Sequence, residues 1–308
     1  MRNAFAEELT KLASENKKVM LLSGDIGNNL FNNFKLIAPE RFYNCGVAEA
    51  NMTGVAAGLA MMGFRPVTYT ITPFAIVRCL EQIRVDVCYH NVPVIIAGTG
   101  SGLSYASLGP THHSCDDIGF MRMLPNMTIL CPCDPIEVKS ALRAAFQLNS
   151  PVYIRLGKTG EPNIHKAPPE FIIGRSITML EGRDICILST GNIMPVALEV
   201  AENLETYNVS VRVENFHTIK PLDTDSLKNI FSEYKLVATL EEHSLINGLG
   251  GAVAEWISDQ NKYNVKLLRF GTRDEFMSTI GSQNYARAYY NLTPEYIVSA
   301  IKENLCKQ

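Results

Sequence analysis

The chain has 308 residues, of which 46% are hydrophobic and 19% charged, and its formal net charge is −3. This length favours two domains of about 150 residues each, and the composition is that of a globular protein rather than a disordered one. The slightly negative charge excludes the basic surface that is typical of proteins that bind nucleic acids or anionic membranes.

The N-terminal segment and the cysteines indicate the compartment. Residues 2–16 have the pattern of an amphipathic helix and lack the continuous apolar core of a signal peptide, and no run of about 18 apolar residues occurs in the chain. We read the cysteines as reduced, buried residues, with no metal-ligand companions beside Cys131 and Cys133, and expect a cytoplasmic protein. The eight cysteines lie at positions 45, 79, 88, 115, 131, 133, 186 and 306.

In the first half of the chain, runs rich in β-branched residues alternate with segments of helical length and pattern. Helices are expected at residues 2–16, 48–62, 74–90 and 135–148. Strands are expected at residues 19–24, 41–45, 65–70, 92–98, 127–132 and 151–156. This alternation is typical of an α/β domain whose sheet is mainly parallel.

A second alternation follows residues 157–182, which are rich in Pro and Gly and break the pattern. Its strands are expected at residues 184–190, 209–215, 235–242 and 264–270, and its helices at 193–207 and 249–260. The predicted fold class is therefore α/β, with two consecutive domains of mainly parallel sheet. We place the domains at residues 1–165 and 180–308, joined by a linker at 166–179.

Residues 46–60, GVAEANMTGVAAGLA, set one carboxylate, Glu49, in a helix of small and apolar residues. Burying an ionised carboxylate without a partner is costly, so Glu49 needs a specific polar partner. Gly and Ala recur every three or four residues, which lets the helix pack closely against another backbone, as at a subunit contact or beside a flat ligand. Taken alone, Glu49 could instead cap a turn or pair with an arginine.

Residues 102–117, GLSYASLGPTHHSCDD, form a second candidate site. This loop follows a buried strand, and loops at the carboxyl ends of parallel strands hold ligands and reactive groups in α/β proteins. His112, His113, Asp116 and Asp117 could in principle bind a metal, but adjacent pairs rarely converge on one ion and no other His or Cys cluster completes a site. Solvated loop histidines are the remaining alternative.

Two further Gly-containing segments at strand ends are less specific. Residues 21–29, LLSGDIGNN, resemble a diphosphate-binding turn but lack the patterns G-x-G-x-x-G and G-x-x-x-x-G-K-[ST]. Residues 240–255, LEEHSLINGLGGAVAE, place Glu241, Glu242 and His243 before a Gly-rich helix start, where an anion or a neighbouring subunit could bind. Plain helix–strand packing explains that segment equally well.

Taken in chain order, these motifs resemble the C-terminal half of the transketolase family, whose members use thiamine diphosphate. The resemblance covers nearly the whole chain, and it implies that residues 1–165 are the family's pyrimidine-binding domain and residues 180–308 its C-terminal domain. The matching motifs are MRNAFAEEL, GVAEANMTGVAAGLA, TPFAIVRCLEQIRVDV, LGPTHHSCDDIGFMRMLPNMTIL, PVYIRLGK, IKPLD, LEEHSLINGLGGAVAE and GSQNYARAYYNLTPEYI.

The resemblance implies a set of residues at the cofactor. Glu49 would hydrogen-bond a ring nitrogen of the cofactor's aminopyrimidine and share its proton. Phe74 matches the aromatic residue that stacks on that ring, and Ile71 stands three residues before it, where relatives often carry another aromatic residue. Asp25 falls where relatives have an acid close to the cofactor, and Arg78, in the same motif as Phe74, is expected at the cofactor as well.

The resemblance also implies a substrate site. His112 matches the histidine of the family's Thr-His-Gln loop and would face the substrate as a hydrogen-bond donor or proton shuttle. His113 follows it where the family has Gln, and we expect it at the substrate too. Arg2 and Lys158 match positions that hold the sugar phosphate, which suits a cationic side chain.

Two positions in this implied pocket depart from the family. Leu108 stands where the family usually has an aspartate that accepts a hydrogen bond from a sugar hydroxyl. Gly100 stands where the family has a histidine that contacts the phosphate. A leucine cannot accept a hydrogen bond from a hydroxyl. We therefore expect an unusual or modified sugar rather than an ordinary pentose phosphate.

The diphosphate and metal ligands of the family lie in a separate N-terminal domain, in a Gly-Asp-Gly sequence and a distant Asn. Here the only similar string, GDIG at residues 24–27, belongs to the start of the pyrimidine-binding domain. We therefore expect a second polypeptide that supplies these ligands and Mg²⁺, in an α2β2 assembly that contains a homodimer of this chain.

The expected activity is that of a transketolase-like transferase, which moves a two-carbon ketol unit from a ketose to an aldose and is active only with its partner. One alternative is the beta subunit of a 2-oxo acid dehydrogenase, which has the same two-domain layout. A non-catalytic paralogue that only binds a partner is the other.

Overall fold

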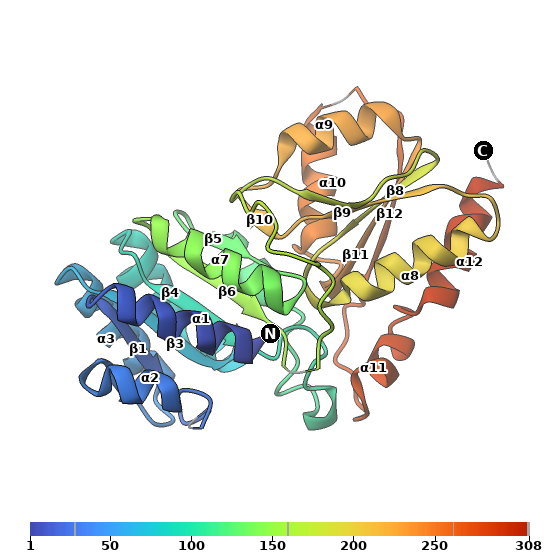
Figure 1. The fold of residues 1–308 in the computed structure, drawn as a ribbon. Coiled ribbons are helices and arrows are strands. Elements are labelled where there is room, and N and C mark those ends of the chain that lie inside the picture. The colour runs from blue at the N-terminus through green and yellow to red at the C-terminus, as the bar shows by residue number, and fades with distance from the viewer. Residues whose placement is uncertain (28, 159, 261, 307–308) are drawn as a thin grey trace.

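The computed structural model describes residues 1–27, 29–158, 160–260 and 262–306. Two α/β units follow one another along the chain, each built on one central sheet (Figure 1). The predicted fold class, α/β with two mainly parallel sheets, is therefore confirmed. Within the described ranges, no helix combines the length and the apolar character needed to cross a membrane.

The first half of the chain supplies six strands and most of the helices that cover them. In chain order its elements are α1 (Arg2–Glu15), β1 (Val19–Ser23), α2 (Asn32–Ile37), the 3₁₀ turn η1 (Pro39–Arg41), β2 (Phe42–Asn44), α3 (Glu49–Met61), β3 (Arg65–Ile71), α4 (Thr72–Ile76), the 3₁₀ turn η2 (Val77–Cys79), α5 (Leu80–Gln82), the π-helix η3 (Ile83–Tyr89), β4 (Ile95–Thr99), the 3₁₀ turn η4 (Ala106–Leu108), α6 (Asp117–Arg122), β5 (Thr128–Leu130), α7 (Pro135–Gln147) and β6 (Val152–Leu156).

The second half supplies the other sheet and one additional strand. Its elements are β7 (Ile177–Leu180), β8 (Ile185–Ser189), the 3₁₀ turn η5 (Gly191–Ile193), α8 (Met194–Glu205), β9 (Val211–Asn215), β10 (Thr218–Lys220), α9 (Thr224–Glu233), β11 (Leu236–Ser244), α10 (Leu249–Gln260), β12 (Lys266–Thr272), α11 (Gln283–Tyr289) and α12 (Pro294–Leu305).

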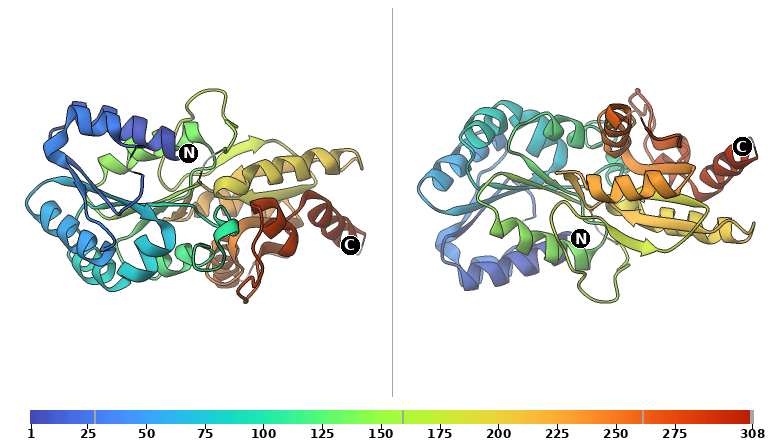
Figure 2. Two further views of the ribbon diagram at one scale, coloured as in Figure 1. Left: turned by 90° about the horizontal axis from the view of Figure 1, so that it is seen from below. Right: turned by 90° about the horizontal axis from the view of Figure 1, so that it is seen from above.

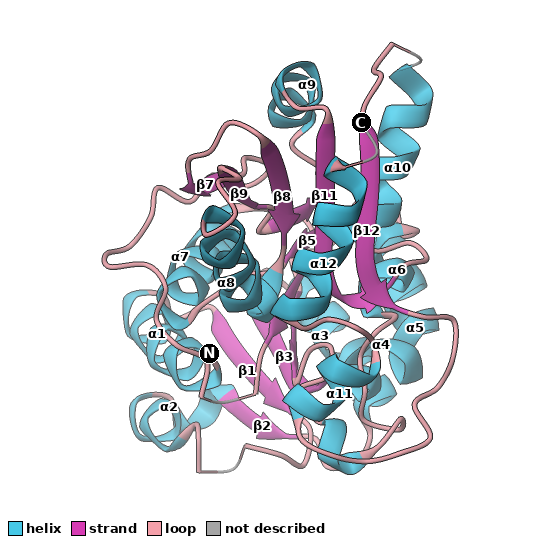
Figure 3. Cartoon of the chain, turned by 90° about the vertical axis from the view of Figure 1, so that its right-hand side faces the viewer, coloured by secondary structure: helices cyan, strands magenta, loops and turns pink. Residues whose placement is uncertain are grey.

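The first sheet has seven strands in the order β10-β5-β6-β4-β3-β1-β2, and the second has five in the order β12-β11-β8-β9-β7. All strand pairs are parallel except β10 with β5 and β7 with β9. Because β10 belongs to the second half of the chain, its pairing with β5 ties the two units together. Figure 3 shows the strands of the second sheet with α8 and α12 in front of them.

Helices cover both faces of the first sheet (Figure 2). Leu21 of β1 packs among side chains of α1 and α7, whereas its neighbour Leu22 packs among side chains of α3 and the helical run of residues 72–89. Successive side chains of a strand point to opposite faces, so a strand covered on both faces is buried along its length. The strands β1, β4 and β6 are buried at every residue, which explains their continuous apolar sequences.

The structure differs from the expected elements in several places. The helix expected at residues 74–90 is divided into α4, η2, α5 and η3, and a π-helical turn of this kind often lies at a functional site. Strand β7 begins at Ile177, within the segment expected to be linker. The elements that were not expected are α2, α6, α9, α11, α12 and β10. The eight cysteines, all of them described, form no disulfide, and five are buried.

Candidate active site

The candidate site lies at the carboxyl edge of the first sheet. Strands β1, β3, β4 and β6 are neighbours in parallel register, with Ser23 opposite Tyr69 and Thr99 opposite both Ile71 and Leu156. The loops that follow these strands therefore begin at the same edge, where α/β folds bind ligands. The segments that follow these strands include residues 24–27, the helical residues 72–78 and the loop of residues 102–117, all of which the sequence singles out.

Glu49 is the first residue of α3 and is only 3% exposed. The positive end of the helix dipole favours a negative charge at this position. Its Oε2 accepts a hydrogen bond from Nη1 of Arg78 at 2.6 Å. The arginine partner that sequence reasoning left open as an alternative is therefore present in this structure.

The other oxygen of Glu49 faces the end of β1. A Cβ placed on Gly24 would lie 3.6 Å from Oε1 of Glu49 and 2.8 Å from Oγ1 of Thr70, so any larger residue at position 24 would crowd this corner. Oγ1 of Thr70 is buried and has no hydrogen-bond partner within the described residues. Gly24 thus leaves a narrow space between two oxygen atoms that can accept hydrogen bonds.

Phe74, Arg78 and His112 form one group of contacts next to Glu49. The guanidinium carbon of Arg78 lies 4.4 Å from the ring centroid of Phe74, and the ring of His112 meets that of Phe74 edge-on, with centroids 5.3 Å apart. Four of the predicted site residues are therefore brought together. Phe74 and His112 are both partly exposed, so a ligand can reach their rings.

Asp25 and Ile71 lie at the same edge. Asp25 directly follows Gly24 and is exposed, and its Oδ1 accepts a hydrogen bond from Nδ2 of Asn44 at 3.2 Å. Ile71 is the last residue of β3 and is partly exposed. Both positions are compatible with contact to a ligand beside Glu49, but neither adds a charge pair to the site.

Arg2 and Lys158 carry the positive charge of the site. Nζ of Lys158, just beyond β6, lies 4.7 Å from the ring centroid of Tyr105. Arg2 lines a cavity of about 470 Å³ with Gly27 and Asn29, which follow β1. Neither cation makes an ion pair with a carboxylate in the described part of the chain. Two uncompensated cations at one edge favour binding of an anion.

The loop of residues 100–117 is fixed by buried charges. Arg155 of β6 pairs with Asp117 at 2.7 Å, and its Nη2 donates to the carbonyl oxygens of Ser114 and Glu242 at 2.8 and 2.9 Å. Tyr153 also donates to Asp117. Burial is the largest influence on Asp117 and raises its pKa, but the surrounding charges, that of Arg155 first, and the hydrogen bonds from Arg155 and Tyr153 together outweigh burial and hold the pKa below its usual value. Asp117 therefore orders the loop, which leaves it a poor metal ligand.

His113 points to a different place from His112. It lines a cavity of about 300 Å³ with Cys115, Asp116 and Tyr290, between the loop and the second unit. Burial lowers the pKa of His113, so its ring is neutral at pH 7. The structure thus brings His112, but not His113, next to Phe74.

Glu241, Glu242 and His243 at the end of β11 are all fully buried. The carboxylate of Glu241 accepts hydrogen bonds from the backbone of Leu249 and Gly250 at 2.7 Å each, so it occupies the start of α10, where sequence reasoning left room for an external anion. Nε2 of His243 lies 3.2 Å from the backbone nitrogen of Gly119. This segment holds the two units together.

Sequence reasoning missed two features. The first is Tyr105, whose ring lies beside Gly100. The glycine at position 100, which leaves room for a neighbouring ring, is the sequence feature that could have indicated it. The second is a group of ligand-type atoms from Cys133, Glu137 and His165, all within 4.8 Å of one another. Glu137 accepts a hydrogen bond from the backbone of Cys133, and Asp134 accepts one from the backbone of Glu137. These hydrogen bonds at the start of α7, together with the one that Glu137 accepts from Asn215, account for both acids without a metal.

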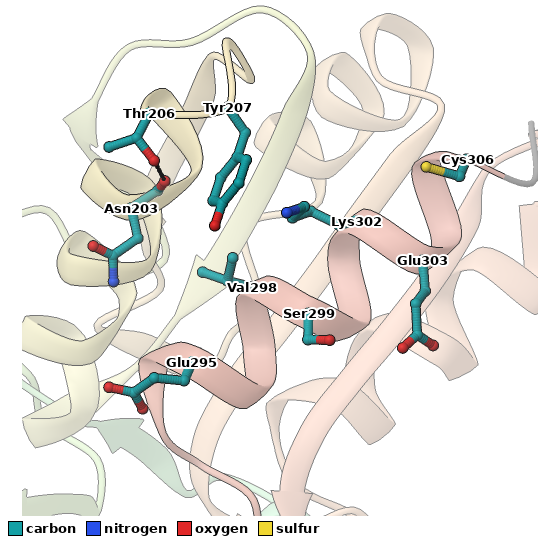
Figure 4. A pocket seen from close by; sticks show the side chains of 9 residues that line it. All are labelled: Asn203, Thr206, Tyr207, Glu295, Val298, Ser299, Lys302, Glu303 and Cys306. Carbon is teal, nitrogen blue, oxygen red and sulfur yellow. Dashed lines mark hydrogen bonds between the residues drawn. The ribbon is translucent and has the colours of Figure 1, made fainter.

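A separate cavity of about 830 Å³ lies between α8 and α12, away from the first sheet. Figure 4 shows its side chains, with Lys302 directed toward Tyr207, whose ring centroid lies 3.3 Å from Nζ. None of the predicted site residues lines it.

Known families match the two halves of the chain. Residues 1–161 match the family described as transketolase, pyrimidine binding domain, and residues 174–297 match transketolase, C-terminal domain. The chain is 36% identical over 311 residues to a putative transketolase C-terminal section of Methanocaldococcus jannaschii, covering 100% of this chain and 97% of that protein. It is 32% identical over 308 residues to one of the subunits of apulose-4-phosphate transketolase of Phocaeicola vulgatus, covering 99% and 95%.

A solved structure has the same fold over nearly its whole length. It is described as a split gene transketolase, inactive beta4 tetramer, and it superposes with a TM-score of 0.90 at 35% identity, covering 98% of this chain and 97% of that one.

Proposed function

Because the chain belongs to the transketolase family, we propose that it is one subunit of a two-subunit transketolase that transfers a two-carbon ketol unit from a ketose to an aldose. In this proposal the chain supplies the pyrimidine side of a thiamine diphosphate site. The observation that carries it is that one arginine, Arg78, contacts both the buried carboxylate of Glu49 and the partly exposed ring of Phe74 at the carboxyl edge of the first sheet.

The residues present fit an aminopyrimidine. A flat aromatic heterocycle needs a ring to stack on and polar atoms at its edge, and Phe74 and Glu49 offer these around a shared neighbour, Arg78. Oγ1 of Thr70, buried and without a partner in the described residues, adds an acceptor beside Gly24. When bound, thiamine diphosphate stabilises the carbanion that forms after cleavage of a carbon–carbon bond.

Each residue has a separate task in this proposal. Glu49 holds a proton at a ring nitrogen of the pyrimidine, in a pocket where water does not compete for its carboxylate. Phe74 stacks on the ring, a contact worth roughly 0.5–1.5 kcal/mol beyond burial of area. His112, at the edge of Phe74, donates a hydrogen bond or moves a proton at the substrate oxygen. Asp25 and Ile71 border the same ligand.

The substrate in this proposal carries an anionic end. Arg2 and Lys158 have no carboxylate partner in the described residues, and both lie at the edge that contains Glu49. Leu108, 51% exposed, offers no hydrogen-bond acceptor to a sugar hydroxyl. A relative named for apulose-4-phosphate supports an unusual sugar phosphate as substrate. His113 remains a predicted substrate contact that would require the loop to turn.

The partner in this proposal binds the diphosphate and Mg²⁺, and two copies of each chain form an α2β2 assembly. The solvent face of α3 supports a contact between subunits, since a Cβ atom added at Gly58 would meet nothing within 4 Å and Val55 is 45% exposed. Two relatives support the same division, because one is named as a single subunit of a transketolase and the other as a split gene transketolase.

Calorimetric titration of thiamine diphosphate with Mg²⁺ tests this proposal. The chain is titrated alone and mixed with the polypeptide encoded beside its gene, and ketol transfer from ketose phosphates is then assayed with the mixture. Binding and transfer only in the mixture are expected. Turnover by this chain alone would contradict the two-subunit proposal, and decarboxylation of 2-oxo acids without ketol transfer would favour a dehydrogenase subunit instead.

A further inference from the structure

Tyr105, directly before the turn η4, has no assigned role in the motifs described above. We propose that Tyr105 is a specificity-determining residue that donates a hydrogen bond to the terminal phosphate of the sugar substrate, beside Lys158 and Arg2. This inference rests on the proposed function and names one contact within its substrate site.

The ring of Tyr105 fills the space that a side chain at position 100 would take. Gly100 directly follows β4 and has a φ of +82°, and a Cβ on it would lie 2.0 Å from both Cδ2 and Cε2 of Tyr105. No residue larger than glycine can share this space with the ring. The side chain of Tyr105 therefore reaches the carboxyl edge of the sheet at the position where the family's histidine is absent.

Tyr105 connects the cationic end of the site with the end that contains Phe74. Nζ of Lys158 lies 4.7 Å from its ring centroid, a distance typical of a cation–π contact. The ring of His112 meets Tyr105 edge-on with centroids 6.3 Å apart, and His112 in turn contacts Phe74. A sugar that extends from Phe74 toward Lys158 would therefore pass along Tyr105.

The charge around Tyr105 is positive. Burial raises the pKa of Tyr105, and the positive charge of Arg2 opposes that rise. Nε of Arg2 is buried and has no hydrogen-bond partner among the described residues, and Lys158 makes no ion pair there. One such cation, Lys158, lies over the face of the phenol and the other, Arg2, acts on it through its charge, an arrangement that favours a dianion such as a phosphate.

The hydroxyl of Tyr105 is available to such a ligand. It makes no hydrogen bond to any described residue. Its oxygen is also not one of the fully buried side-chain atoms that lack a partner, so it keeps some contact with solvent. The residue as a whole is only 8% exposed, so the ring is held in place while the hydroxyl stays reachable. A positioned phenol donates well to a phosphate oxygen.

The first test measures binding of inorganic phosphate to the full chain by ³¹P NMR titration, with no partner and no cofactor. Tyr105→Phe keeps the ring against Gly100 and removes only the hydroxyl, so it is expected to weaken phosphate binding about tenfold. Tyr296→Phe is the matched control, because Tyr296 lies on α12, is 48% exposed and makes no side-chain hydrogen bond in the described residues. It is expected to bind phosphate as the wild type does.

The second test uses the reconstituted two-subunit enzyme. Tyr105→Phe is expected to raise the KM for a ketose phosphate about tenfold and to leave the KM for the unphosphorylated ketose unchanged. Ser107 is exposed and lies in η4, the turn that directly follows Tyr105, so Ser107→Ala is expected to alter neither KM value.

Either of two results would overturn the inference. One is phosphate binding that Tyr105→Phe leaves unchanged, and the other is a wild-type chain that does not bind phosphate at millimolar concentrations. Failure of the mixture to bind thiamine diphosphate would instead contradict the proposed function, and the phosphate titration would still report on Tyr105.

Discussion

Arg78 pairs with Glu49 across 2.6 Å, from Nη1 to Oε2, and the same guanidinium lies over the ring of Phe74. The arginine therefore contacts both groups that the proposed function assigns to the pyrimidine. The side chain of Arg78 is 43% exposed and that of Glu49 is 4% exposed, so the arginine can move into solvent while the carboxylate cannot. A ligand at Glu49 would compete with Arg78 for the same carboxylate oxygen.

Replacing Arg78 tests how much Glu49 depends on it. Arg78→Met leaves a buried carboxylate without its partner, and we expect the free energy of unfolding to fall by about 1–2 kcal/mol, less than for a fully buried pair because Arg78 is partly exposed. Urea unfolding measures the change. Arg84→Met, an exposed arginine in the same helical run with no ion pair in the described residues, should change it by less than about 0.5 kcal/mol.

Glu49→Gln separates catalysis from stability. The amide still accepts a hydrogen bond from Arg78 but cannot hold a proton at the pyrimidine, so ketol transfer by the reconstituted enzyme should fall about 10²–10⁴-fold. The free energy of unfolding should change by less than about 1 kcal/mol, because the neutral side chain no longer needs a charged partner. Glu81→Gln, in the same helical run as Arg78 but without an ion pair in the described residues, serves as control. Full activity of Glu49→Gln would favour the non-catalytic paralogue.

Phe74→Leu tests stacking. Leucine keeps an apolar side chain next to Arg78 and His112 but loses the flat ring, so the Kd of the two-subunit complex for thiamine diphosphate should rise about 2–10-fold. Calorimetric titration of the complex gives this value directly. A Kd equal to that of the wild type would show that the pyrimidine does not lie on Phe74.

The sequence predicts the buried strands and the helix of Glu49 because each is a nearly continuous apolar run, and β1 and β6 match their expected ranges within one residue, whereas β4 begins three residues later than expected. It does not predict that Arg78 contacts Glu49, since the two are 29 residues apart and only the fold of residues 72–89 brings them together. The resemblance assigns Phe74 to the cofactor and His112 to the substrate, and the structure brings their rings into contact. The pairing of β10 with β5 has no sequence signal, because three residues carry too little pattern to identify a partner strand.

Glu242 holds the loop of residues 102–114 against α11. Its carboxylate accepts from the backbone of Leu103 at 2.9 Å, from Gln283 at 2.9 Å and from Arg287 at 2.6 Å, and it is fully buried. Glu242→Ala should lower the free energy of unfolding by about 3–5 kcal/mol, because it leaves Arg287 and two amide donors without their acceptor. Urea unfolding measures this loss.

The same variant should also speed hydrogen exchange in residues 102–114, since Leu103 loses its acceptor. Glu255→Ala is the matched control, because it also removes a carboxylate paired with an arginine, Arg122, but the Glu255 side chain is 58% exposed. An exposed pair of this kind should contribute at most about 1 kcal/mol. Equal effects of the two variants would contradict the structural role given to Glu242.

His217 gives a prediction about pH. It is fully buried, its ring stacks on Phe171 with centroids 3.9 Å apart, and its Nδ1 lies 2.9 Å from Oγ1 of Thr218. Burial lowers the pKa of His217 to about 4, and the nearby charge of His165 acts in the same direction. In the unfolded chain a histidine titrates near pH 6.5.

The unfolded state therefore binds the proton first as the pH falls. The contribution of neutral His217 to stability is complete above pH 6.5 and is lost by about 1.4 kcal/mol per pH unit down to about pH 4. His217→Gln removes this titration, so the stability advantage of the wild type over the variant should shrink by about 2–3 kcal/mol between about pH 7.5 and about pH 4.5. Urea unfolding of both proteins across this range measures the difference in stability between them. Titratable groups that both proteins share contribute little to that difference. A gap that stays constant would mean that His217 titrates alike in the folded and unfolded chain.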